Sequence, residues 1–273
     1  MNQDFRLPSF TMSDYNDYRL DDWIFWAFVL AGLAFCLVHA ARRAYRQPAP
    51  TASPEISAPQ TTAEEDEIRR HTLFQRIYHW SNAIAILILV ISGWMIYQTP
   101  GSPESAAAGP FAWHRWGVAF LLVGILFHLI YESFIARDPN PMVFNFSEIR
   151  KILAIFKNFF GVSKFYPMAG KYHPGQIFFH WTVAANILAL ILTGFVLWKP
   201  FRDLLPLPFF GLGWNFIFYC RLLHGLFAAT LIASLMGHIY FALFIKKNWT
   251  ETQSMVTGRI PAREYFQTHL PPE

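Results

Sequence analysis

Two stretches of the sequence, HWSNAIAILILVISGW at residues 79–94 and HWTVAANILALILTGF at residues 180–195, share one pattern that decides the fold. Each begins with His-Trp, continues as a nearly unbroken apolar run, and ends with a hydroxyl residue, a glycine and an aromatic residue. An α-helix needs roughly 20 mostly apolar residues to cross a bilayer. The two stretches therefore predict two transmembrane helices that belong to an internal repeat.

A second predicted helix follows each stretch and extends the repeat. His114 aligns with His224 and His128 aligns with His238, and 14 residues separate the two His of each helix. On an α-helix 14 residues advance by about 21 Å and return to within about 40° of the same face. Each half is therefore predicted to be a hairpin, whose second helix carries two His near opposite edges of the membrane core.

The first helix of each half carries a glycine at the same spacing. His79 precedes Gly93 by 14 residues, and His180 precedes Gly194 by 14 residues. A glycine removes the side chain where a flat, bulky group has to approach the backbone. Neutral imidazole is a good axial ligand of haem iron, and helical bundles place such ligands on facing helices. The pattern predicts b haems held by four of the six His, in six-coordinate sites that favour electron transfer.

The positions of the His along their helices predict one ligand pair and leave the other open. His114 and His224 lie near the outer membrane face and are expected to pair with each other. On the inner side the repeat allows two symmetry-related pairs, which are His79 with His238 or His180 with His128.

The composition excludes several classes of protein. The chain has 273 residues, of which 54% are hydrophobic and 15% charged, whereas soluble domains carry about 25% charged residues. The composition therefore argues against a soluble enzyme and rules out disorder for most of the chain. Two Cys and the absence of a C-x-x-C-H motif exclude a disulfide framework, a Cys-rich zinc site and covalently attached haem. A net charge of +4 fits basic membrane loops better than nucleic-acid binding.

The predicted fold is an all-α integral membrane protein: a four-helix haem bundle made of two similar hairpins, plus one extra N-terminal transmembrane helix. The extra helix has an acidic N-terminal flank and is followed by Arg42 and Arg43, so it is expected to be a permanent anchor. The five spans are expected at about 23–41, 79–98, 114–135, 177–198 and 217–245. The predicted regions are an anchor (1–46), a flexible linker rich in Pro, Ala, Thr and Glu (47–68), the haem unit (69–249) and a cytoplasmic tail (250–273).

The distribution of basic residues predicts the orientation. Of the 22 Lys and Arg, 16 lie on one side of the predicted spans and 6 on the other. Because cytoplasmic loops carry the excess of Lys and Arg, the N-terminus is expected in the periplasm and the C-terminus in the cytoplasm of a bacterial inner membrane. Residues 147–160 have apolar positions at helical spacing, and we expect an amphipathic helix on the cytoplasmic surface.

The four-helix unit, roughly residues 69–260, resembles the cytochrome b (gamma) subunit of membrane-bound formate dehydrogenases. The resemblance rests on RIYHW at 76–80, ISG at 91–93, GKYHPGQ at 170–176, WKPF at 198–201, LLH at 222–224 and GHIY at 237–240. The resemblance implies that His79 and His238 ligate the inner haem and that His114 and His224 ligate the outer haem. It also implies a quinone site beside the inner haem, at His173, Gly175 and Gln176.

The chain departs from this family at three places. The family has Asn where His173 stands, residues 1–68 lie outside the resemblance, and His128 and His180 are not family ligands. As symmetry mates of His238 and His79, these two His suggest a third haem on the inner side. The alternative is that they form hydrogen bonds to a haem propionate, a quinone or a backbone carbonyl.

The resemblance implies an electron-transfer and quinone-reducing subunit with no substrate-oxidising site of its own. Electrons are expected to pass from an iron–sulfur subunit, itself fed by a catalytic subunit on the outer face, through two b haems to menaquinone or ubiquinone near the cytoplasmic side. One alternative is the cytochrome b anchor of a hydrogenase or of a thiosulfate or polysulfide reductase. A haem-free transporter lined with His is the alternative from another class, and it predicts broken or polar helices at mid-membrane.

Overall fold

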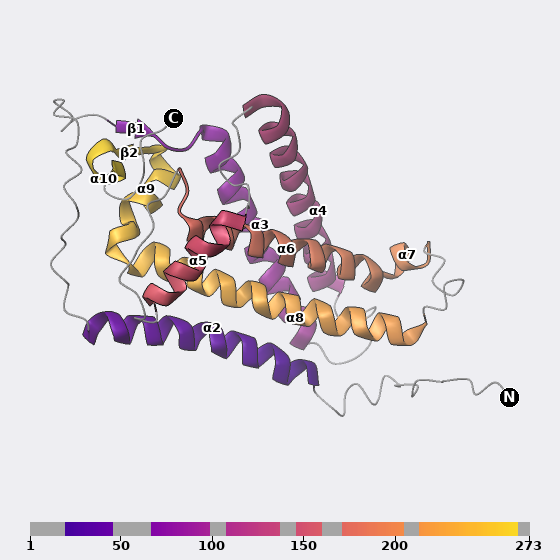
Figure 1. The fold of residues 1–273 in the computed structure, drawn as a ribbon. Helices are drawn as coiled ribbons and strands as arrows, with labels where there is room; N and C mark the ends of the chain where they lie inside the picture. The colour runs from indigo at the N-terminus through magenta and orange to yellow at the C-terminus, as the bar shows by residue number, and fades with distance from the viewer. Residues whose placement is uncertain are drawn as a thin grey trace. The chain divides into compact units, whose positions relative to one another are not determined.

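The computed structural model describes residues 20–45, 67–98, 108–136, 146–159, 171–204 and 213–266 (Figure 1). Its long helices are α2 (Leu20–Tyr45), α3 (Leu73–Gln98), α4 (Ala108–Ile130), α6 (Pro174–Leu197) and α8 (Trp214–Ile239). All five are long and apolar enough to cross a membrane, which confirms the five predicted spans.

Large apolar side chains cover the outsides of these helices. Leu87 of α3, Leu126 of α4 and Leu188 of α6 are each more than half exposed. Water would make this surface unfavourable, whereas lipid is as apolar as the side chains themselves. A helix also satisfies its backbone hydrogen bonds internally, as the lipid core requires.

The chain forms two compact units. One contains residues 1–41 and 181–238, and the other contains residues 42–180 and 239–273. The boundaries fall inside α6, after His180, and inside α8, after His238.

In the first unit, small residues and polar side chains join the helices. A Cβ atom built on Gly32 of α2 would lie only 2.8 Å from the Cβ of Ala233 in α8, so α2 packs closely against α8 at this point. Between α6 and α8, the hydroxyl of Thr230 donates a hydrogen bond to Oδ1 of Asn186. Close approach at small residues and hydrogen bonds between helices are the usual means of packing inside membranes.

In the second unit, α3 and α4 form an antiparallel pair (Figure 1). A Cβ atom on Gly117 would lie 3.0 Å from Leu89, and one on Gly124 would lie 3.3 Å from Oδ1 of Asn82. Residues farther along α4 therefore contact residues nearer the start of α3, as expected for antiparallel helices. The two helices therefore pack against each other along their lengths.

A short π-helix follows the second helix of each half. The π-helix η1 (Tyr131–Ala136) begins three residues after His128, and η2 (Tyr240–Phe244) begins two residues after His238. π-Helices are rare and occur frequently at functional sites. Both π-helices follow the second His of their helix, but their starts differ by one residue relative to that His.

The second unit also contains a small module that we call the terminal cap. It consists of β1 (Glu67–Arg69), residues 70–72, α9 (Trp249–Thr257), β2 (Arg259–Pro261) and α10 (Ala262–Phe266). β1 pairs antiparallel with β2, with Ile68 opposite Ile260. These residues fall in the predicted linker (47–68), the ends of the haem unit (69–249) and the predicted tail (250–273), and the strands went unpredicted because three residues leave no recognisable hydrophobic pattern.

One glycine closes the terminal cap. Gly258 has a φ of +84° and ends α9, a backbone conformation that favours glycine. Its carbonyl oxygen accepts hydrogen bonds from the backbone N–H groups of Arg70 and His71 at 2.9 and 3.2 Å. A Cβ atom at this position would lie 2.9 Å from the carbonyl oxygen of His71.

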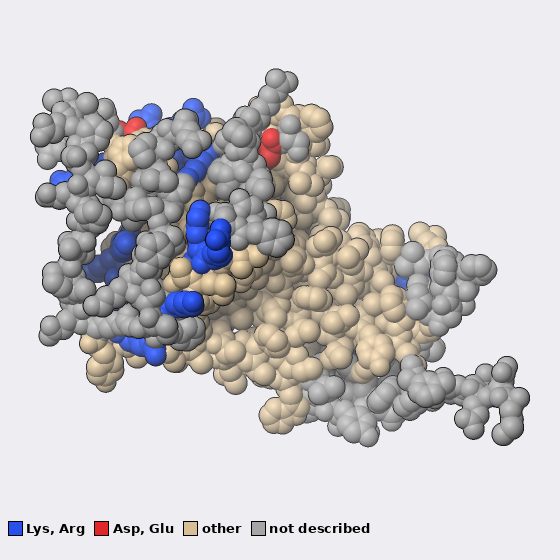
Figure 2. All heavy atoms as spheres, viewed as in Figure 1, with Lys and Arg blue, Asp and Glu red and all other residues tan. Residues whose placement is uncertain are grey.

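The amphipathic segment forms α5 (Phe146–Phe159), within one residue of the predicted bounds. Arg150 and Lys157 are exposed on it, and Figure 2 shows Lys and Arg gathered over this helix. Phe156 contacts Phe178 of α6 edge to face, with ring centroids 6.2 Å apart. The remaining short elements are α7 (Lys199–Arg202) and η3 (Lys246–Asn248).

Candidate functional site

His114 of α4 forms a hydrogen bond to the hydroxyl of Ser92 in α3. The distance between Nδ1 of His114 and Oγ of Ser92 is 3.0 Å. The same Oγ donates its only hydrogen to the carbonyl oxygen of Ile88, four residues earlier in α3, at 2.7 Å. The hydroxyl must then accept from His114, so Nδ1 carries the ring proton and Nε2 keeps its lone pair.

His224 of α8 repeats this arrangement in the other half. Its Nδ1 lies 2.9 Å from Oγ1 of Thr193 in α6. Oγ1 donates to the carbonyl oxygen of Ala189 at 2.7 Å, so it also accepts from the imidazole. Metal-ligating His almost always donate the other ring N–H to such a partner, which fixes the tautomer and orients the ring.

The two predicted glycines lie beside these same imidazoles. A Cβ atom on Gly93 would lie 3.6 Å from Cε1 of His114, and one on Gly194 would lie 3.3 Å from Cε1 of His224. A longer side chain at either position would reach the ring. Glycine therefore keeps the edge of each imidazole free of a neighbouring side chain.

The other four His of the two halves have different surroundings. The ring of His128 stacks on Tyr78, with centroids 4.2 Å apart and an interplanar angle of 10°. His79 packs edge to face on the neighbouring Trp80, with centroids 5.3 Å apart. His180 and His238 are half-buried in α6 and α8.

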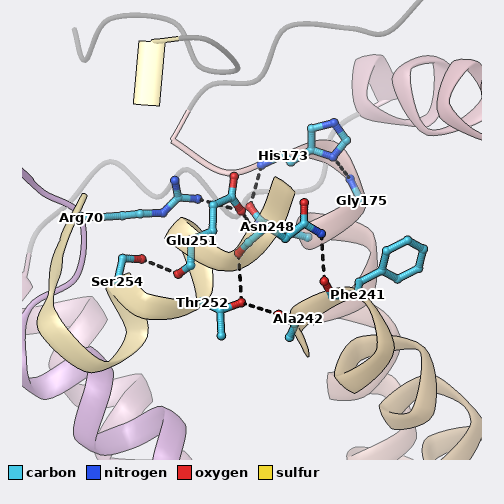
Figure 3. Close-up of polar contacts among 10 residues, drawn as sticks. Arg70, His173, Gly175, Phe241, Ala242, Asn248, Glu251, Thr252 and Ser254 are labelled. Atoms are coloured by element: carbon cyan, nitrogen blue, oxygen red, sulfur yellow. Dashed lines mark hydrogen bonds and ion pairs between the residues drawn. The ribbon is translucent and has the colours of Figure 1, made fainter. Parts of the chain in front are cut away.

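The loop that leads into α6 is held by hydrogen bonds around His173 (Figure 3). Its backbone N–H donates to Oε1 of Gln176 at 2.9 Å. The backbone N–H of Gly175 donates to Nδ1 of His173 at 3.2 Å. Nδ1 is therefore an acceptor, and the neutral ring carries its proton on Nε2. Gln176 caps the start of α6, and Nε2 of His173 is a hydrogen-bond donor.

Glu251 of α9 connects this loop to the terminal cap (Figure 3). Its Oε2 accepts a hydrogen bond from the amide of Gln176 at 2.8 Å. The same oxygen lies 3.7 Å from Nη2 of Arg70, whose side chain is only 1% exposed. The sequence does not predict this interaction, because Arg70 and Glu251 are far apart along the chain and belong to no shared motif.

Side-chain hydrogen bonds also tie α9 to the end of η2 (Figure 3). Asn248 donates to the carbonyl oxygen of Phe241 at 3.1 Å, and Thr252 donates to that of Ala242 at 3.0 Å. On the other side, the indole N–H of Trp80 in α3 donates to the carbonyl oxygen of Met255 at 3.1 Å. The cap is therefore attached directly to α3, which carries His79, and to the π-helix that follows α8.

His71 is a buried titratable group in the cap that the sequence analysis did not single out. It is 4% exposed, and its pKa is lowered from 6.5 to about 3. Burial is the largest cause, followed by the positive charges of Arg70 and Lys171 and then by His79 and Arg76. His71 is therefore neutral at pH 7 and lies in a positive electrostatic field.

The sequence also matches a known protein family. The family model described as prokaryotic cytochrome b561 matches residues 70–258. This match covers more than half of the chain, so the chain belongs to the prokaryotic cytochrome b561 family. The match begins at residue 70, after the N-terminal helix.

Curated relatives include cytochrome b subunits of formate dehydrogenases, which confirms the resemblance. The chain is 28% identical to the cytochrome b556(fdo) subunit of Escherichia coli K12 over 203 residues, or 71% of this chain and 85% of the relative. It is 24% identical to the nitrate-inducible cytochrome b556(Fdn) subunit of the same strain over 218 residues. This alignment covers 75% of this chain and 88% of the relative. It is also 24% identical to the formate dehydrogenase cytochrome b556 subunit of Haemophilus influenzae over 220 residues. This alignment covers 77% of this chain and 83% of the relative.

Proposed function

We propose that this member of the prokaryotic cytochrome b561 family carries electrons through two b haems from an outer-face partner to a quinone near the cytoplasmic side. Family and relatives establish the coarser statement, a multi-pass membrane cytochrome b of a respiratory oxidoreductase. The observation that carries the finer proposal is the matching hydrogen bond of His114 to Ser92 and of His224 to Thr193.

The residues of the chain fit haem at the outer site. Both imidazoles present Nε2 as the ligand atom, and both have a glycine beside the ring. His114 and His224 would hold the haem iron, and the bound haem would supply one-electron redox chemistry without a position for a substrate. Within its own half of the chain, each ring is oriented and its tautomer is fixed by the hydroxyl of the neighbouring helix.

The inner site is proposed from the repeat and from the resemblance. His79 and His238 are its ligands, and they occupy the ends of their spans that lie toward the basic side. The stacking of His128 on Tyr78 supports a packing role for His128, and therefore two haems rather than three.

The quinone is proposed to bind at His173, Gly175 and Gln176. The Nε2–H group of His173 is suited to donate to a quinone carbonyl, because Nδ1 already accepts from Gly175. Gln176 holds the loop in place through its cap on α6 and its hydrogen bond to Glu251. Reduction of a quinone takes two electrons and two protons, and the proposed protons come from the cytoplasmic side. The quinone is menaquinone or ubiquinone.

The partners follow from the names of the relatives, which are cytochrome subunits of formate dehydrogenases. We infer an iron–sulfur subunit and a catalytic subunit on the outer face of a bacterial inner membrane, with the N-terminus periplasmic and the C-terminus cytoplasmic. The excess of Lys and Arg on the opposite side of the spans supports this orientation.

Haem content tests the proposal directly. The full chain is purified as wild type, as His114→Ala and as His224→Ala, with His39→Ala of α2 as the control. A pyridine haemochrome assay is expected to find two haems in wild type and in the control, and one in each of the other variants. Two haems in His114→Ala or His224→Ala would contradict the outer site, and a colourless wild type would contradict the proposal as a whole.

A further inference from the structure

The helix α5 carries an exposed apolar band and an exposed basic band side by side. Because each residue of an α-helix turns by about 100°, Ile149, Leu153 and Phe156 fall within about 60° of one another. Their side chains are 36%, 53% and 40% exposed. Arg150 and Lys157 are exposed as well, and they follow about 40–60° beyond Leu153. The two bands therefore run next to each other along α5.

The apolar band is not the side with which α5 packs on the chain. Ile152 is 8% exposed and lies about 60° from Ile149, on the side away from Arg150. Burial of Ile152 shows that this third side of the helix faces the protein. The exposed apolar band is therefore left to an apolar environment outside the chain.

One contact places α5 at the end of a membrane span. Phe156 contacts Phe178 of α6 edge to face, with ring centroids 6.2 Å apart. The 24 residues of α6 begin at Pro174 and give a helix about 36 Å long, against about 30 Å for the hydrocarbon core of a bilayer. Phe178 lies about 6 Å from the first residue of this helix. The contact therefore sets α5 at the depth where lipid headgroups meet acyl chains.

The basic band gives this surface a preference for one charge. The sequence of α5 contains three basic residues and one acid. Arg150 and Lys157 form no ion pair or hydrogen bond with any residue that the structure describes. Long basic side chains keep their apolar stems on an apolar surface and extend their charge to the headgroup level. Water alone would hydrate the two charges but would leave the neighbouring apolar band unfavourably exposed.

We propose that α5 is a binding surface for anionic phospholipids of the membrane that the five long helices cross. Ile149, Leu153 and Phe156 insert among the upper acyl carbons, while Arg150 and Lys157 bind the lipid phosphates. A zwitterionic lipid also has a phosphate, but its own cation neutralises it, so a lipid such as phosphatidylglycerol is preferred. The surface needs neither haem nor quinone, and its test is therefore independent of the proposed function.

The test measures which lipid lies next to the apolar band. The full chain carries Leu153→Cys labelled with the fluorophore NBD, and the buried Cys36 and Cys220 are replaced by Ala. It is reconstituted into vesicles with equal amounts of phosphatidylglycerol and phosphatidylcholine, in which a small fraction of one or the other lipid carries a nitroxide on its acyl chain. The nitroxide on phosphatidylglycerol is expected to quench NBD roughly threefold more than the same nitroxide on phosphatidylcholine.

Charge variants show which residues carry the preference. Arg150→Gln with Lys157→Gln should make the two nitroxide lipids quench equally, while quenching itself persists because the apolar band is intact. Arg150→Lys keeps the charge and should keep the preference. Lys199→Gln with Arg202→Gln is the matched control, because it removes two charges from α7, directly after the other end of α6, and it should leave the ratio unchanged. High salt should lower the ratio of the unsubstituted basic band.

Three outcomes would overturn the proposal. The first is equal quenching by the two lipids when Arg150 and Lys157 are both present, which would show no preference for charge. The second is a ratio that responds equally to Arg150→Gln with Lys157→Gln and to the control, or to neither. The third is the absence of quenching by either lipid, which would place the apolar band outside the membrane. Cross-linking from the Leu153→Cys position would then identify a second copy or another protein as its cover.

Discussion

The Oγ1 atom of Thr193 lies 2.9 Å from Nδ1 of His224, and Oγ of Ser92 lies 3.0 Å from Nδ1 of His114. Two halves of one chain thus hold an imidazole in the same way, although one uses threonine and the other serine. Each hydroxyl is fixed by the carbonyl four residues before it. The orientation of each ring is therefore set by the backbone of the neighbouring helix.

Removing the hydroxyl of either Ser92 or Thr193 is expected to change the midpoint potential of one haem. In Ser92→Ala or Thr193→Ala the Nδ1–H group loses its acceptor, so the imidazole donates less electron density to the iron. The midpoint potential of the outer haem should rise, on the order of tens of millivolts. Redox potentiometry of the purified chain measures this change.

Ser234→Ala is the control for these variants. Ser234 of α8 donates to the carbonyl oxygen of Thr230 at 2.8 Å, four residues earlier, as Ser92 does to Ile88. Its replacement should leave both haem potentials unchanged. Equal shifts in Ser234→Ala and Ser92→Ala would show that the effect comes from the helix backbone and not from the imidazole.

Gly258→Ala is expected to open the terminal cap. The residue has a φ of +84°, and the new Cβ atom would lie 2.9 Å from the carbonyl oxygen of His71. The strain should destabilise the cap by about 1–3 kcal/mol. Hydrogen exchange of residues 67–72 and 256–261 should become faster. Gly225→Ala, where nothing lies within 4 Å of the new atom, should leave these rates unchanged; unaltered rates in Gly258→Ala would contradict the prediction.

The stability of the terminal cap should fall as the pH is lowered. The pKa of His71 is about 3 in the folded chain, below its usual 6.5. The stabilisation from the neutral ring is therefore complete above pH 6.5 and is lost progressively as the pH falls toward 3. Between pH 7 and pH 5 the loss in the haem-free chain should be about 2 kcal/mol.

Hydrogen exchange at the two pH values, corrected for intrinsic rates, measures this loss. His71→Gln cannot titrate, so its cap should show a much smaller change over the same range. An equally steep pH dependence in His71→Gln would assign the effect to another group.

Glu251→Ala is expected to destabilise the cap and the loop before α6 together. The substitution leaves the buried guanidinium of Arg70 without this carboxylate and removes the acceptor of the Gln176 amide. Because Glu251 is partly exposed, we expect a loss of about 2 kcal/mol, less than for a fully buried pair. Thermal unfolding in detergent and limited proteolysis of the loop measure it.

Glu264→Gln provides the comparison. Glu264 is an exposed acid of the same cap that accepts a hydrogen bond from Thr250, and its replacement should change the unfolding temperature little. If Glu251→Ala behaved like Glu264→Gln, the hydrogen bond to Gln176 would not hold the loop.

The sequence predicted the spans and the repeat because both depend on local patterns. Apolar runs mark the helices, and equal spacing marks the shared positions of His114 and His224. The hydroxyl before each glycine was visible too. Its bond to an imidazole was not, because that contact depends on how far α3 is rotated against α4, and α6 against α8, which no spacing within one helix reveals.

The terminal cap was beyond prediction for a different reason. Its strands have three residues each, and residues 67–69 pair with residues 259–261 across almost the whole chain. In the sequence, Arg70 and Glu251 each resemble ordinary charged residues on the basic side of the predicted spans. Only the structure shows that the buried guanidinium of Arg70 lies 3.7 Å from Glu251, and that Glu251 also accepts a hydrogen bond from Gln176 of the candidate quinone loop.

The pairing of Glu67–Arg69 with Arg259–Pro261 also sets an order for biosynthesis. A ribosome delivers the first strand before α3 enters the membrane and the second only after the last span has been made. The cap can therefore close only when synthesis is nearly finished. A polypeptide that ends just after the last span keeps all five hydrophobic segments yet lacks Glu251, the carboxylate beside Arg70.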